Sequence, residues 1–161
     1  MSGAFRIRHA TERDQLAIAT LVHSEHLNPI DINWRRFVIA IDRTGVLGAV
    51  QLRQHADQSR ELGSLVVRED ARGRGIASRL IDALLAPIAT RVLMITGAAF
   101  ATHYTRWGFK RIPPASAPSA VRRNYYFGKF IGGALSLLSG RAPRELAILD
   151  RKPPARPTAL Y

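Results

Sequence analysis

The sequence predicts an α/β domain built around one strand–turn–helix unit, and three observations support this fold class. Residues 62–67 form a short apolar run rich in β-branched residues, which suits a buried strand. After a polar turn, apolar residues from Ile76 to Ile88 recur at the spacing of one helix face. A further apolar run at 91–96 predicts a strand parallel to the first, because a crossover helix joins parallel strands.

The segments before this unit predict a strand, a helix and a hairpin. Residues 5–9 alternate between apolar and polar, as in a strand with one exposed face. Thr11 is a candidate cap for a helix that runs to about Leu27, with Asp14 at the capping-box position. Residues 37–41 and 46–52 read as two strands joined by a turn.

The segments after the unit predict shorter elements separated by breakers. Three prolines within 113–118 interrupt regular structure, and Gly132-Gly133 leaves the length of the following helix open. In chain order we expect a short helix at 100–107 ending at Gly108, a strand at 109–112, a helix within 121–138 and a last strand at 145–149.

Size and composition favour one domain. The 161 residues are 47% apolar, enough to bury a substantial core. With no cysteine, the sequence offers neither a disulfide framework nor a thiolate nucleophile. We see no signal peptide and no apolar run of the length that a membrane span needs, so a cytoplasmic protein is expected.

The positive charge is concentrated in the C-terminal third. The formal net charge is +12, of which residues 106–161 contribute +9 and the first 105 residues +3. This balance favours phosphate-bearing or acidic partners.

Two glycines at the expected start of the helix, Gly73 and Gly75, suggest a phosphate site. Without Cβ atoms, they let a ligand approach backbone amides that have no intrahelical partner, where the helix dipole adds positive charge. Arg72 and Arg74 add cationic donors beside them. The alternative is a turn with solvated arginines.

Two motifs resemble a known family. Arg72-Gly73-Arg74-Gly75-Ile76-Ala77 resembles the Arg/Gln-x-x-Gly-x-Gly/Ala loop of the GNAT superfamily of acyl-CoA-dependent N-acyltransferases. Downstream, residues 104–109 are similar to its Tyr-x-x-x-Gly-Phe block. The resemblance extends over about residues 5–112. The glycine loop lacks the Gly-Lys-Ser/Thr of a nucleotide P-loop and the third glycine of a dinucleotide fingerprint.

The resemblance implies the GNAT fold, an α/β (α+β) architecture. This fold has a mixed central sheet of about six to seven strands with a V-shaped splay, flanked by about four helices. Residues 1–152 would form a single domain with an atypical insertion at about 113–143, followed by a Pro-rich tail at 153–161.

The resemblance also implies an N-acetyltransferase that transfers acetyl from acetyl-CoA, as co-substrate, to a primary amine of a small molecule or protein by direct ternary-complex transfer. No metal is expected. A pair formed by His55 and Asp57 has no further ligands nearby in the sequence. The implied cofactor-binding residues are Val66, Val67, Arg72, Gly73, Arg74, Gly75, Ile76 and Ala77.

The implied catalytic residues are Tyr104 and Glu61. Tyr104 would hydrogen-bond the CoA sulfur and protonate the departing thiolate. Glu61 lies where many relatives carry a general base, and His55 and Glu25 are weaker substitutes. The alternatives are a core aromatic for Tyr104 and an exposed carboxylate at a strand end for Glu61.

Other functions stay open. Many relatives have an asparagine seven residues before the tyrosine, where this chain has Gly97. A CoA-binding regulatory or interaction module without turnover is therefore the alternative, with its basic C-terminal third docking on an acidic partner. The partners to weigh are an amine acceptor, a second copy in a homodimer, nucleic acid and an anionic membrane.

Overall fold

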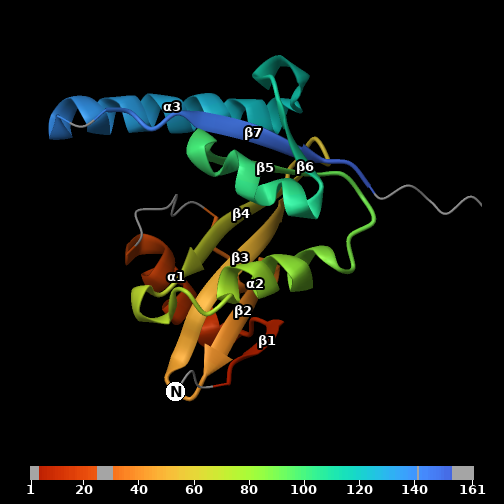
Figure 1. Ribbon diagram of the computed structural model, residues 1–161, viewed down its shortest axis with the longest axis vertical. Helices are drawn as coiled ribbons and strands as arrows, with labels where there is room; N and C mark the ends of the chain where they lie inside the picture. The colour runs from red at the N-terminus through yellow and green to blue at the C-terminus, as the bar shows by residue number, and fades with distance from the viewer. Residues whose placement is uncertain (1–3, 25–30, 141, 154–161) are drawn as a thin grey trace, which may run out of the picture. The chain divides into compact units, whose positions relative to one another are not determined.

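The computed structural model describes residues 4–24, 31–140 and 142–153. Within these ranges seven strands form a mixed sheet in the order β1-β2-β3-β4-β5-β7-β6, shown in Figure 1. The described residues group into two compact units, the first of residues 1–53 and 62–88 and the second of 54–61 and 89–161. The single domain over 1–152 with its insertion and tail stays a prediction, as does the splay of the central strands.

The first unit carries the first half of the sheet and two α-helices. Its strands are β1 Arg6–His9, β2 Phe37–Asp42, β3 Gly45–Gln54 and β4 Arg60–Val67. The last residue of β3 and the first two of β4, which are Gln54, Arg60 and Glu61, belong to the second unit. Its helices are α1 Gln15–Ser24 and α2 Ile76–Leu85, with short 3₁₀ turns η1 Glu12–Asp14, η2 Trp34–Arg36 and η3 Glu69–Ala71.

The first three strands form an antiparallel meander, as the hairpin pattern predicted. β1 pairs with β2 and β2 with β3, with a register shift between Ala40 and Ile41. Apolar residues on both faces of β2 are buried. Phe37 and Ile39 pack against α1, and α2 also contacts β2. A strand covered on both faces has a continuous apolar sequence rather than an alternating one.

Gly48 in β3 allows α2 to begin close to the strands. A Cβ atom at this position would lie 2.9 Å from the Val66 carbonyl oxygen and 3.1 Å from Ile76 Cγ2. Any larger residue would therefore push away the first residue of α2. The close approach fixes the start of the helix beside the end of β4.

The second unit holds the other strands and the longest helix. Its elements are β5 Val92–Gly97, η4 Ala98–Trp107, β6 Phe109–Ile112, η5 Pro114–Ser116, α3 Ser119–Ser139 and β7 Leu146–Arg151. β7 lies between β5 and β6 and is antiparallel to both, so the last described strand is inserted between two earlier ones.

Helix α3 lies alongside β7 through its first half only. Val121 and Tyr125 pack with Leu93 and Ile148 in the core of this unit. Figure 1 shows the C-terminal part of α3 extending beyond the start of β7. The helix continues through Gly132-Gly133, so those glycines do not end it.

Two details differ from the sequence-based expectation. The element before Gly108 is a 3₁₀ helix that begins at Ala98, two residues earlier than predicted. Thr11 and Asp14 do bond to each other, but they enclose the 3₁₀ turn η1 rather than the first turn of α1. The predicted end of that helix near Leu27 lies outside the described residues.

Among the helices of the described ranges, none has the length and apolar character needed to cross a membrane.

Candidate functional site

The loop between β4 and α2, residues 68–75, is the first candidate site and is here called the amide loop. Gly73 and Gly75 have φ angles of +77° and +73°, which only glycine adopts without strain. A Cβ atom at either position would meet nothing within 4 Å. The glycines are therefore required by the backbone conformation and leave open space beside the chain.

The amide loop leads into the N-terminus of α2. Gly75 is the N-cap and provides no side chain to bond the first amides of the helix. Those amides have no intrahelical acceptor by geometry, and the helix dipole concentrates positive charge on them. Ile76 is buried, so only its backbone could face a ligand, whereas Ala77 is half-buried. This arrangement can accept an anion such as a phosphate group.

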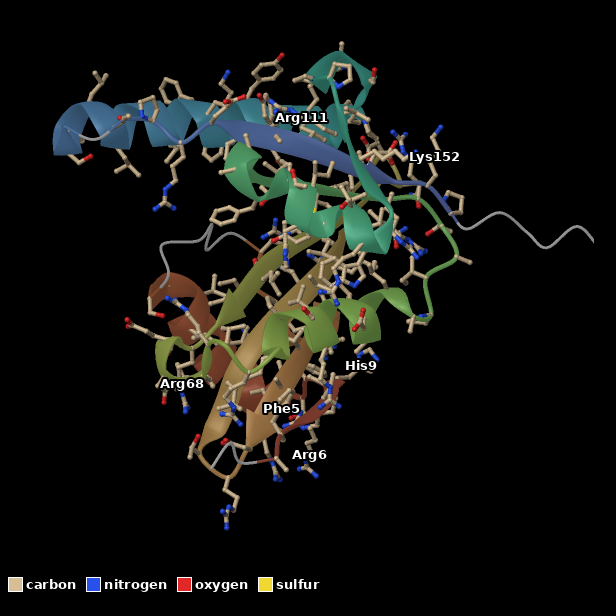
Figure 2. All side chains as sticks on the ribbon, in the orientation of Figure 1. Phe5, Arg6, His9, Arg68, Arg111 and Lys152 are labelled. Carbon is tan, nitrogen blue, oxygen red and sulfur yellow. The ribbon has the colours of Figure 1, made fainter. Side chains whose placement is uncertain are left out.

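Arginines surround the amide loop but do not all point the same way. The Arg72 Nε donates to the Val67 carbonyl oxygen over 3.3 Å, which closes the loop on its own strand. Arg74 lies 3.9 Å from Asp42 Oδ2 and stacks over the Phe5 ring at 5.6 Å. Figure 2 labels Phe5 and Arg68, two of the residues around this part of the first unit.

Strand β4 has an irregular backbone at Ser64, whose φ angle is +49°. The Ser64 hydroxyl lies 2.9 Å from the Gln51 amide and accepts from Arg53 over 3.1 Å. Val66 is buried in the core of the first unit, so its side chain is structural.

In the second unit, Glu61 forms a buried cluster with two partners, here called the Glu61 cluster. Glu61 Oε2 lies 2.8 Å from His55 Nε2 and accepts from Asn124 Nδ2 over 3.1 Å. Glu61 is 4% exposed. The alternative of an exposed carboxylate at a strand end is therefore wrong.

The Glu61 cluster brings together residues that are far apart in the sequence. His55 is held by its own loop, where its N–H donates to Ser59 and its carbonyl accepts from Gln58. Asn124 comes from α3, and its role was missed. Its only sequence signal is a polar residue within the helix stripe that also holds Val121 and Tyr125.

Asp57 connects the same loop to the N-terminus of α3. Its Oδ2 accepts from the Ala120 amide over 2.9 Å and from the Ser119 hydroxyl over 3.0 Å. Hydrogen bonds from Ser59, Ala120 and Ser119 hold the pKa of Asp57 well below its usual range. Asp57 is thus a helix cap supplied by another segment. Within the described ranges no group of His, Asp or Glu could hold a metal ion.

Tyr104 lies in η4 among other rings of the second unit. Its ring centroid is 5.5 Å from His103 and 6.4 Å from Phe109, both in edge contact. Burial raises the pKa of the Tyr104 phenol, and a hydrogen bond with Thr96 has the smaller, opposite effect. The phenol therefore stays protonated at neutral pH and can donate a proton. Tyr104 is only half-buried, unlike a core aromatic.

Gly97 occupies the position where many relatives have asparagine, and its surroundings explain the glycine. A Cβ atom there would lie 3.2 Å from the Phe100 ring. An asparagine at this position would therefore require the exposed Phe100 ring to shift slightly.

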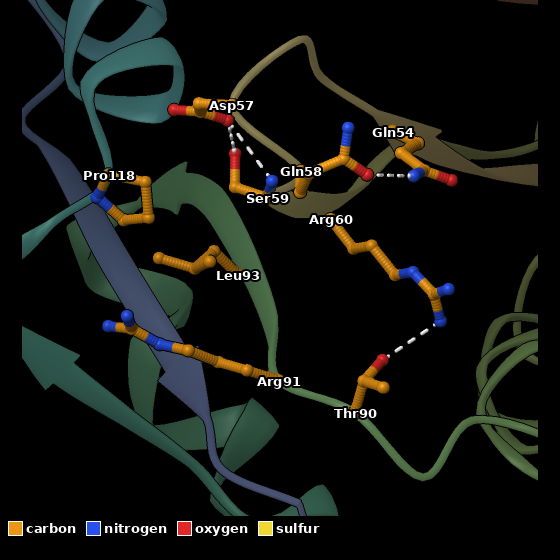
Figure 3. A pocket seen from close by; sticks show the side chains of 9 residues that line it. All are labelled: Gln54, Asp57, Gln58, Ser59, Arg60, Thr90, Arg91, Leu93 and Pro118. Carbon is orange, nitrogen blue, oxygen red and sulfur yellow. Dashed lines mark hydrogen bonds between the residues drawn. The ribbon is translucent and has the colours of Figure 1, made fainter.

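A cavity of about 430 Å³ lies beside the loop of the second unit that contains Asp57 and Ser59 (Figure 3). Its charged groups already have protein partners, since Arg60 donates to Thr90 and Arg91 binds Asp150. None of the residues predicted for catalysis or cofactor binding lines it. We therefore place no substrate there.

The fold and the amide loop define the class of protein. Residues 33–111 match the family described as acetyltransferase (GNAT) domain. This match assigns residues 33–111 to the GNAT family of acetyltransferase domains.

Solved structures show the same fold at low sequence identity. An N-acetylglutamate synthase from Neisseria gonorrhoeae, complexed with coenzyme A and N-acetyl-glutamate, is 19% identical with a TM-score of 0.66. Rv2747 from Mycobacterium tuberculosis, in complex with CoA, is 20% identical with a TM-score of 0.67. Ard1 from Thermoplasma volcanium is 13% identical with a TM-score of 0.63.

The matched lengths differ among these structures. The alignment covers 94% of this chain but only 36% of the synthase, so the chain spans about a third of that protein. It covers 91% of this chain and 98% of Rv2747, and 93% and 98% for Ard1. No curated protein matches the sequence.

Proposed function

We propose that the protein transfers the acetyl group of acetyl-CoA to a primary amine of a small molecule or protein, directly within a ternary complex. The observation that carries this proposal is the amide loop, in which two glycines with positive φ leave space at the N-terminus of α2. Acetyl-CoA would supply the thioester. The chain itself binds and orients the two substrates and moves the protons.

In this proposal the amide loop binds the pyrophosphate of CoA. The backbone amides from Gly73 to Ala77 donate to phosphate oxygens, and Arg72 and Arg74 add positive charge. The strand end at Val66 and Val67 offers backbone groups to the pantetheine arm. Phosphate binding through the backbone explains why the loop depends on glycine more than on any particular side chain.

The Glu61 cluster is proposed to accept the proton of the acceptor amine. A carboxylate only accepts hydrogen bonds, so in its pair with ionised Glu61 the His55 Nε2 carries a proton. His55 Nδ1 then has the lone pair and can act as the base, while Glu61 stabilises the resulting positive charge. Glu61, predicted as the base, would thus act through His55. Glu25, another candidate base, lies outside the described residues.

Tyr104 is proposed to donate a proton to the departing thiolate of CoA. Its phenol is protonated at neutral pH because burial raises its pKa. The two proton transfers are balanced, since the amine loses one proton and the thiolate gains one.

The acceptor class rests on the similar structures and on charge. The synthase of Neisseria gonorrhoeae is complexed with N-acetyl-glutamate in one structure and with L-arginine in another. The strongly positive chain disfavours polyamines. We therefore propose amines that are neutral or carry a carboxylate, such as amino acids and peptide N-termini.

Two experiments test the proposal. An acceptor screen with amino acids, polyamines, aminoglycosides and peptides, read out as free CoA thiol, should show turnover with amino acids or peptides. The variant Tyr104→Phe should lower turnover roughly a hundredfold or more while CoA affinity stays the same. An unchanged rate would remove the proposed role of Tyr104.

The alternative is a CoA-binding module without turnover, and Gly97 is the observation that favours it. If CoA binds tightly in calorimetry but no amine releases thiol from acetyl-CoA, the protein is a CoA-binding module and not the proposed enzyme.

A further inference from the structure

The C-terminal half of α3 has an apolar surface that the described residues leave open to solvent. Phe130 is 73% exposed, Leu137 89% and Leu138 86%. Side chains project from α3 on the side facing away from β7 (Figure 2). Single exposed apolar residues occur on most proteins, but a contiguous group of large ones indicates an interaction surface.

These residues lie on one side of the helix. With 100° between successive residues, they span about half of its circumference, from the side opposite the stripe of Val121 and Tyr125 round to Leu135, which adjoins that stripe. The set is here called the apolar face, and its members are Tyr126, Phe127, Phe130, Ile131, Ala134, Leu135, Leu137 and Leu138. Because the core lies on the other side, the apolar face is not needed for folding of the second unit.

Helix α3 itself is basic and contains no Asp or Glu, although Asp57 and Glu61 contact its first half. The sequence from Ala83 to Arg144 has no Asp or Glu, but it has nine Lys or Arg. On α3 itself Arg122, Arg123 and Lys129 are exposed. An apolar face beside exposed cations is the composition of helices that lie in the interface of an anionic membrane.

We propose that α3 docks on an anionic lipid surface, with the apolar face buried among the acyl chains and the basic residues against the headgroups. This occupant fits the charge better than the others do. A second copy would bring two basic surfaces together without an acidic counterpart. Nucleic acid would satisfy the cations but would not bury three exposed leucines.

The attachment of α3 to its unit makes such docking possible without unfolding. Its N-terminus is capped by Asp57, and Asn124 donates to Glu61. The first half therefore stays fixed while the second half presents the apolar face.

The test is flotation of the full chain with vesicles. We expect it to float with equimolar phosphatidylcholine and phosphatidylglycerol and not with phosphatidylcholine alone. Raising the salt to about 0.5 M should weaken binding, because exposed charges are then screened. Failure to float with anionic vesicles, or equal binding to both kinds, would overturn the proposal.

Variants separate the apolar and the charged contributions. Leu137→Ser with Leu138→Ser should weaken vesicle binding at least tenfold, since two large apolar side chains are no longer buried on binding. Leu16→Ser is the matched control, because Leu16 is 78% exposed on α1, and it should bind like the wild type. Arg123→Gln should weaken binding about fivefold, whereas Arg13→Gln should not.

Two outcomes would assign the apolar face to another partner. A dimer in light scattering that the Leu137→Ser, Leu138→Ser variant converts to a monomer, without vesicle binding by either form, would show that a second copy covers the face. Binding to RNA or DNA that this variant retains, again without vesicle binding, would show a nucleic-acid surface.

Discussion

The amide loop and the Glu61 cluster are built in opposite ways. The amide loop presents its backbone, because Gly73 and Gly75 keep side chains away. The Glu61 cluster is made of side chains, since His55 and Asn124 converge on one carboxylate oxygen. The amide loop should therefore be sensitive to an added methyl group. The Glu61 cluster should be sensitive to a substitution that removes the charge of a side chain but keeps its shape.

The largest effect is expected for Glu61→Gln. The amide keeps the shape of the side chain but loses the negative charge that stabilises a protonated His55. Turnover should fall roughly a hundredfold or more, with CoA affinity unchanged. Glu145→Gln is the control, because Glu145 is an exposed carboxylate of the same unit, paired with Arg111. Equal activity of the two variants would show that Glu61 is purely structural.

The next effect is expected for Gly75→Ala. The residue would have to keep a left-handed conformation that costs roughly 1–2 kcal/mol, and its methyl group would stand in the space beside the amides. CoA affinity should fall about tenfold, with little change in turnover at saturating CoA. Gly132→Ala in α3 is the control, since no atom lies within 4 Å of its added methyl and its φ is negative. CoA affinity unaffected by Gly75→Ala would argue against phosphate binding there.

A moderate effect on stability is expected for Asp57→Ala. The variant removes the cap of α3, so Tm should fall by a few degrees in calorimetry. Asp57→Asn can still accept hydrogen bonds from Ala120 and Ser119 and should recover most of the loss. A Tm unchanged by Asp57→Ala would mean that α3 does not depend on this cap.

The smallest effect concerns acid stability. Hydrogen bonds from Arg8 lower the pKa of Asp14 from 3.8 to about 2. Because the folded-state pKa is depressed, this contribution is complete above the unfolded-state pKa and is lost as the pH falls from about 4 to about 2. Asp14→Asn should flatten Tm against pH in this window. Glu12→Gln should leave the slope as in the wild type.

The sequence was sufficient for the amide loop because its determinants are local. Two glycines, the strand before them and the periodic helix after them all lie within one stretch of chain. The Glu61 cluster was only partly predictable. The type and position of Glu61 could be named, but its burial depends on Asn124, which is 63 residues away. Likewise, the conformation of Ser64 depends on its partners Gln51 and Arg53 in the neighbouring strand.

The position of β7 has a consequence for synthesis of the chain. Since β5 and β6 both pair with β7, neither has its antiparallel partner until residues 146–151 have left the ribosome. Late strand pairing of this kind slows folding and exposes apolar edges in the meantime. The second unit is therefore expected to complete its fold only after residues 146–151 have emerged, whereas β1, β2 and β3 can pair earlier.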